Sequence, residues 1–155
     1  MRWHAEQCLV GKTREQDNKC WFDRHSLVHT FTNAVVMHLI LLAVTLYSGG
    51  TSYSVRQLLV AFVLTNGLHV LDDLSNNLTG YSFESLTCMC RLYDGDSVQN
   101  FLGDILCGLF STGIVLAILW GNPKWRRLQY IVGGLLVSLI GTFVSVMLRR
   151  YIKKQ

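Results

Sequence analysis

The chain has 155 residues, which is enough for one domain. Half of its residues are hydrophobic, but only 15% are charged, against roughly 25% in a typical soluble domain. Although the net charge is +4, the basic residues flank apolar runs and do not form a stripe with interleaved aromatic residues. This distribution argues against a nucleic-acid partner and leaves a very apolar soluble protein or a membrane protein.

Long stretches without any charge decide between these two classes. Lys, Arg, Asp and Glu are missing from residues 25–55, 57–71, 105–123 and 128–148. A helix that spans a membrane needs about 20 mostly apolar residues. The sequence therefore predicts an all-α, polytopic membrane protein whose four transmembrane helices form an up-down-up-down bundle. The spans are expected at about 29–47, 55–71, 98–120 and 128–148.

Three regions follow from these spans. Residues 1–27 are polar and form an extramembrane arm, 28–148 form the transmembrane domain, and 149–155 form a basic tail. Four spans place both termini and the polar loop at 74–95 on one side of the membrane, called side A here. Side B holds two short turns with four basic residues, so ten of the 14 basic residues fall on side A. This count favours side A inside, in a multi-pass protein of the bacterial plasma membrane or the mitochondrial inner membrane type.

Polar side chains recur on one helical face at the side-A ends of three spans. The rows have i, i+4, i+8 spacing in the first and third spans and i, i+3 or i+4 spacing in the second. Their members are His25, His29 and Asn33; His69 with Asp72 or Asp73; and Asp96, Asn100 and Asp104. In an up-down-up-down bundle these three helix ends meet at one depth, so we expect one shared polar cluster.

Asp104 is the most demanding member of this cluster. If the third span enters the hydrocarbon near Val98, Asp104 lies roughly 9 Å inside it. A carboxylate near the bilayer centre costs about 2.5 to 3.5 kcal/mol. Asp104 must therefore face protein or water, and His29 and His69 are its expected partners.

Three kinds of chemistry fit such a cluster. His and carboxylate ligands suit Zn, Mn or Fe, a buried His-Asp pair can hold a general base, and the whole set can be a structural polar network. The candidate catalytic residues are His29, His69, Asp96, Asn100 and Asp104. The candidate ligands of a divalent metal are His69, Asp72, Asp73 and Asp104. For Asp96 a second interpretation stays open, because a carboxylate at this position can instead cap the third helix.

The five cysteines give a weaker signal. Cys8, Cys20, Cys88 and Cys90 fall on side A, where two disulfides of unknown pairing are sterically conceivable. Such disulfides would require an oxidising side A, against the basic-residue count. Cys107 lies inside the third span, where we expect it to pack as a small apolar residue.

One segment of the sequence carries a family resemblance. The run Tyr93-Asp94-Gly95-Asp96-Ser97-Val98-Gln99-Asn100, followed by Asp104-Ile105-Leu106, resembles the Tyr-Gly-Asp-Ser-Val-x-Asn-x-x-x-Asp-Ile-Leu segment of an uncharacterised alphaproteobacterial multi-span membrane family of unknown function. Asp23 and His29 match that family's entry into its first span. His69 and Asp72 stand where the family carries Glu, and Asp73 stands where it carries Asn. The layout is also similar to the VanZ-like family of small membrane proteins. The resemblance implies a multi-span architecture and a polar site, and it implies no particular reaction.

Three functions are compatible with these observations. The first is an accessory or structural subunit of a membrane assembly, whose partners are the lipid bilayer and other membrane subunits or a second copy of the chain. The second is a metal-dependent or His/Asp acid-base enzyme that acts on a lipid or polyprenyl substrate. The third is a proton or ion path, motivated by a carboxylate inside the membrane.

Overall fold

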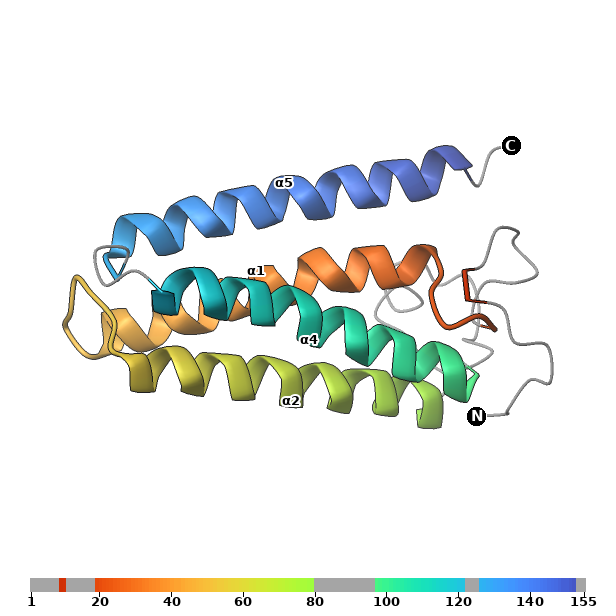
Figure 1. Cartoon of the computed structure of the whole chain (residues 1–155), viewed down its shortest axis with the longest axis horizontal. Coiled ribbons are helices and arrows are strands. Elements are labelled where there is room, and N and C mark those ends of the chain that lie inside the picture. The colour runs from red at the N-terminus through yellow and green to blue at the C-terminus, as the bar shows by residue number, and fades with distance from the viewer. Residues whose placement is uncertain (1–8, 11–18, 80–96, 122–125, 153–155) are drawn as a thin grey trace.

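Four long helices make up most of the part of the chain that the computed structural model describes, which is residues 9–10, 19–79, 97–121 and 126–152. They are α1 (Arg24–Tyr47), α2 (Val55–Thr79), α4 (Val98–Gly121) and α5 (Leu128–Ile152), and they run alternately up and down (Figure 1). Each contains a stretch of 21 to 24 residues that is apolar and long enough to cross a membrane. The predicted fold class, an all-α bundle of four transmembrane helices, is confirmed.

The helix ends are set by residues with suitable side chains. α2 begins after Ser54, which forms a capping box with Gln57: the Gln57 N–H donates to Ser54 Oγ, and Gln57 Oε1 accepts from the Ser54 N–H. α4 begins after Ser97, whose Oγ accepts from the Asn100 N–H. α1 is followed by Gly49, whose positive φ of 68° allows the chain to turn back at the end of the helix.

Helix α1 is the centre of the bundle. It packs against α2, α4 and α5, and α2 also packs against α4. In Figure 1, α5 lies along α1 on the side away from α2. The α1–α5 contact is close where α5 carries small residues, because a Cβ added at Gly134 would collide with the His38 ring and one at Gly141 with the Phe31 ring. This is the packing that small residues permit between helices in lipid.

The side-B end of the bundle is closed by an apolar core and by two connected turns. The core consists of seven buried residues: Met37, Leu41, Tyr53, Leu58, Ala61, Leu119 and Ile131. The turns are joined by backbone hydrogen bonds from Tyr53 N–H to Arg126 O (3.0 Å) and from Leu128 N–H to Thr51 O (2.9 Å). The four helices are therefore tied together at this end.

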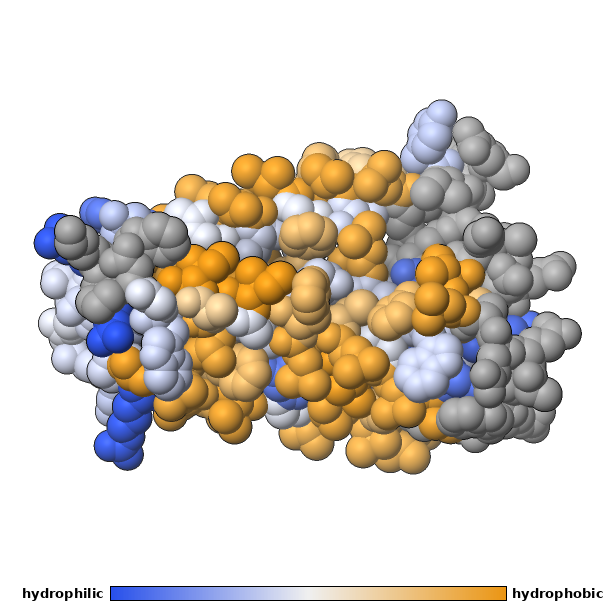
Figure 2. Space-filling view, viewed as in Figure 1, coloured by the Kyte–Doolittle hydropathy of each residue, from blue (hydrophilic) through white to orange (hydrophobic). Residues whose placement is uncertain are grey.

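The outer surface of the bundle is suited to lipid. Figure 2 shows an apolar band along the middle of the molecule, with hydrophilic residues at the side-B end. Large hydrophobic side chains such as Val63, Phe110, Val137 and Ile140 are more than 60% exposed. In water such a surface would be unfavourable, so the protein is an integral membrane protein in contact with the lipid bilayer.

Helix α2 is longer than the predicted span. The sequence suggests a polar loop from Leu74, but the helix continues to Thr79. The Asn77 amide donates to the Asp73 backbone oxygen one turn earlier (2.8 Å), so a polar side chain bonds within the helix beyond the apolar stretch. As a result, Asp73 lies on a helix at a fixed spacing from His69.

Candidate functional site

The first component of the site is the cap of α1. Asp23 Oδ1 accepts from the Ser26 N–H (3.1 Å), while Ser26 Oγ accepts from the Asp23 N–H (3.1 Å). The Ser26 hydroxyl in turn lies 2.5 Å from Asp104 Oδ1 of α4. The hydroxyl has only one hydrogen to donate. Since Asp104 Oδ1 is closer to it than Asp23 Oδ1 (3.4 Å), we assign that hydrogen bond to Asp104. The start of α1 therefore holds the buried carboxylate of α4 in place.

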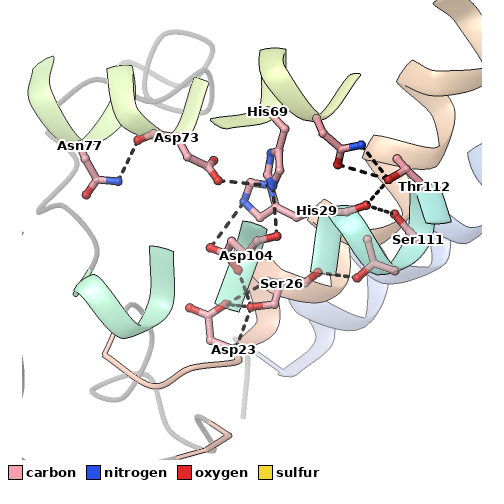
Figure 3. Close-up of polar contacts among 12 residues, drawn as sticks. Asp23, Ser26, His29, His69, Asp73, Asn77, Asp104, Ser111 and Thr112 are labelled. Carbon is pink, nitrogen blue, oxygen red and sulfur yellow. Dashed lines mark hydrogen bonds and ion pairs between the residues drawn. The ribbon is translucent and has the colours of Figure 1, made fainter. Parts of the chain in front are cut away.

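The two histidines lie side by side on the inner faces of α1 and α2 (Figure 3). The ring centroids of His29 and His69 are 5.0 Å apart. His29 Nε2 is 3.9 Å from Asp104 Oδ2, and His69 Nε2 is 3.4 Å from Asp73 Oδ2. His69 Nε2 is also 3.1 Å from the backbone oxygen of Asp104. Three helices thus supply His and Asp side chains to one cluster, here called the His-Asp cluster (His29, His69, Asp73 and Asp104).

Burial differs within this cluster. His69, Asp73 and Asp104 are at most 6% exposed, whereas the His29 side chain is 27% exposed. His29 is therefore the least buried member of the cluster. It lies only three residues after Ser26, the first residue of the apolar stretch of α1.

Part of the cluster has the arrangement of a metal site. His29, His69 and Asp73 each offer one ligand atom, and these three atoms lie within 4.8 Å of one another. Imidazole nitrogen and carboxylate oxygen are ligands of zinc and of other first-row transition metals. The chemistry of the donors fits such an ion.

A second polar layer lies deeper in the membrane. Asn66 of α2 and Thr112 of α4 exchange hydrogen bonds (3.0 and 3.2 Å). The backbone oxygen of Gly108 accepts from Ser111 (3.0 Å) and Thr112 (2.8 Å). These bonds satisfy polar groups that would be costly in hydrocarbon.

The predicted site residues separate into three groups. His29, His69, Asp73 and Asp104 come together as described. Asp72 is exposed and is not a member of the three-residue metal group. Asn100 is buried, but its amide donates to the Cys20 backbone oxygen (3.1 Å), so it contacts the arm. Asp96 lies outside the described residues.

The described end of the arm, residues 19–21, is docked on the first turns of α4. Ser97 Oγ donates to the Lys19 backbone oxygen (3.1 Å), and Gly103 approaches the Trp21 backbone so closely that a Cβ there would overlap it. Cys20 is fully buried and disulfide-bonded, and its partner lies outside the described residues. Cys107 is free, as expected for a cysteine inside a span.

Two participants were not singled out as part of the site from the sequence. Ser26 is the link between the α1 cap and Asp104, and its signal is the spacing Asp23-x-x-Ser26 at the start of a predicted helix. Gly108 provides the close approach of α4, because a Cβ there would lie 2.7 Å from His69 Cδ2. Glycine in a transmembrane segment is common in ordinary packing, so the sequence alone did not distinguish this one.

Comparison with protein-family models, curated proteins and solved structures gave no match to this chain. The resemblances to the alphaproteobacterial family and to the VanZ-like family therefore stay predictions.

Proposed function

We propose that this protein is a membrane enzyme that uses a divalent transition metal, of the zinc class, on an ester of a lipid or polyprenyl substrate at the side-A face. The observation that carries the proposal is the convergence of His29, His69 and Asp73 from two helices, with their ligand atoms within 4.8 Å.

The spacing of the donors supports a metal. In a tetrahedral zinc site with bond lengths near 2.0–2.1 Å, neighbouring ligand atoms are about 3.3–3.4 Å apart. His69 Nε2 and Asp73 Oδ2 are already 3.4 Å apart. The exposed His29 ring is the part that needs to move inward, and it is also the least restrained by burial.

Three protein ligands are the number typical of catalytic zinc sites, in which a water molecule takes the fourth position. Such an ion lowers the pKa of its water and polarises a carbonyl or phosphoryl oxygen. Asp104 Oδ2 lies beside His29, so Asp104 orients that ring and is placed to accept a proton. Ser26 keeps the Asp104 carboxylate in this position through its hydrogen bond.

The tautomer of His69 matters for this proposal. Nε2 is within hydrogen-bond distance of the Asp104 backbone oxygen, to which it donates while it carries a proton. Binding a metal through Nε2 requires the proton to shift to Nδ1, so His69 would change tautomer and give up its hydrogen bond to the Asp104 backbone oxygen.

The position of the cluster along α1 suggests the substrate class. His29 is its least buried member and lies near the side-A end of α1. Ester groups of lipids lie near the boundary between head groups and hydrocarbon, at a comparable depth. A substrate held in the membrane would therefore present its ester to this site.

A second candidate is the accessory or structural subunit. The observation in its favour is that Asp104 is held by Ser26 and that its backbone oxygen is paired with His69, as in a purely structural network. An ion path is less well supported, because the apolar core from Met37 to Ile131 lies between the polar layers and side B.

The test is metal analysis of the purified protein in detergent. We expect about one zinc per chain in the wild type and at least a tenfold loss of zinc affinity in H69Q and D73N. H38Q is the matched control, because His38 is equally buried but bonds to the Ala34 backbone oxygen outside the cluster. Hydrolysis of ester lipids in mixed micelles should stop with a chelator and return with zinc.

Two results would decide against the enzyme. Absence of stoichiometric metal, together with no effect of chelators, would remove the metal-dependent proposal. If D104N lowered stability and co-purification with partner subunits while metal content stayed near zero, the accessory role would replace it.

A further inference from the structure

Asn33 is the deepest member of the polar row on α1. It lies one helical turn below His29, on the same face of the helix, and it is only 6% exposed. Its amide nitrogen Nδ2 is buried and has no hydrogen-bond partner among the described residues. A buried amide with a donor left over is uncommon, because most buried polar groups are paired.

The neighbours of this nitrogen place it against the His-Asp cluster. A Cβ built at Gly108 would lie 2.5 Å from Asn33 Nδ2 and 3.0 Å from His69 Nε2. Both nitrogens are therefore close to one point at the surface of α4. Because position 108 is a glycine, the side chains of Asn33 and His69 can both pack directly against the backbone of α4 there.

Other asparagine amides near the site behave differently. Asn66 Nδ2 donates to the Phe62 backbone oxygen and to Thr112, and Asn100 Nδ2 donates to the Cys20 backbone oxygen. Their hydrogen bonds are internal to the fold. Asn33 differs because its amide nitrogen has no partner among the described residues and lies against the same part of α4 as His69.

We propose that Asn33 Nδ2 is a ligand-binding donor that holds an oxygen of the bound ligand, the carbonyl or phosphoryl oxygen of an ester, beside His69. This inference rests on the proposed metal-dependent function and adds the group that would orient the substrate. A neutral N–H donor aimed at an ester oxygen stabilises the charge that develops on it during attack.

The probe is the Co2+-loaded protein in detergent micelles, whose visible absorption reports on ligands that reach the metal. Acetohydroxamate supplies a carbonyl oxygen and inorganic phosphate supplies phosphoryl oxygens, so the two titrations distinguish the sources. We expect one probe to bind the wild type and to bind roughly threefold to tenfold more weakly to N33L, the loss of one hydrogen bond. Affinity for Co2+ itself should be unchanged in N33L.

The matched control is N66L, which removes a partly buried amide whose hydrogen bonds are internal. It should leave probe affinity unchanged. N33S is the second variant at the site: it keeps a polar group, but its hydroxyl ends closer to the α1 backbone than the Asn33 amide does, and it serves where N33L does not fold. In N33S we again expect weaker probe binding with normal Co2+ binding.

The outcomes separate the two proposals. Equal probe affinity in wild type, N33L and N33S, or no binding of either probe to Co2+-loaded wild type, overturns the role of Asn33 and leaves the metal site standing. Failure of the wild type to bind Co2+ overturns the proposed function itself.

Discussion

The two halves of the bundle use the same four helices but are stabilised differently. In the side-A half the interior holds His69, Asp73, Asn100 and Asp104, all at most 6% exposed. In the side-B half the interior is the apolar core around Leu41 and its neighbours. The helix axes continue from one half to the other, so the difference arises from side chains alone.

The contrast shows that the side-A half carries the energetic cost of placing polar side chains in the membrane. Apolar side chains gain little from leaving lipid, so the side-B half is held by close packing and by the hydrogen bonds between its turns. Polar side chains in hydrocarbon are costly and persist only with partners. Polar and ionisable residues inside a membrane mark candidate functional sites, which is why the side-A half is the place to look for function.

The largest effect is expected where the arm meets α4. In G103A the new methyl group would overlap the Trp21 backbone, which cannot move without detaching the arm from Asn100. We expect a loss of about 3 kcal/mol in the free energy of unfolding, at the upper end for overpacking. Unfolding in mixed micelles with increasing SDS measures it.

G113A is the matched control for this variant. Gly113 is in the same helix, and nothing lies within 4 Å of a Cβ added there. Alanine is also the better helix former, so G113A should be neutral or slightly stabilising. Equal destabilisation of both variants would show that the arm does not support the side-A half.

Much of this fold is predictable from the sequence, because membrane spans depend on composition. Charge-free runs gave four helices, and the i, i+4 spacing placed His29 and Asn33 on one inner face. The end of α2 was not predictable in the same way: Asp72 and Asp73 resemble the start of a loop, yet the helix continues to Thr79. Because α2 continues, Asp73 lies one helical turn after His69 and is buried beside it, whereas Asp72 is exposed.

A cluster of His and Asp side chains was predictable from the sequence, but the contacts of its members were not, for a related reason. Spacing shows which residues share a face, but it does not show how two helices are rotated against each other. Asn100 and Asp104 share a face of α4, yet Asn100 bonds to the arm and Asp104 to α1. The role of Ser26 depends on a contact 78 residues away in sequence, which no local pattern contains.

A smaller effect is expected from a cavity in the side-B half. Leu58 is fully buried in the apolar core, and L58A removes its packing contacts without exposing any polar group. We expect a loss of about 2 kcal/mol, the low end of the range for buried leucines in water-soluble proteins, because lipid is already apolar. SDS unfolding measures the change.

L64A provides the comparison on the same helix, because Leu64 is 48% exposed on the outer surface. Its loss should stay below about 0.5 kcal/mol. Zinc affinity should be unchanged in L58A, since Leu58 lies about 16 Å along α2 from His69. A marked loss of zinc affinity in L58A would mean that the two halves are energetically coupled. The description of them as independent halves would then be wrong.

The smallest effect is expected at Tyr53, where the side-B half has its own buried polar group. The phenol donates to the Leu119 backbone oxygen (3.2 Å), and burial raises the pKa of Tyr53 to about 12, with Arg126 opposing the shift. Because the folded pKa lies above the unfolded value near 10, this group's contribution is fully present below pH 10 and is lost as the pH rises through about 12. Y53F should cost about 1 kcal/mol at neutral pH and should remove the phenolate absorbance step near pH 12. The opposite result would be an absorbance step near pH 10 that is present in the wild type and missing in Y53F. It would mean that the Tyr53 phenol is solvated and that the side-B end is less tightly closed than its hydrogen bonds indicate.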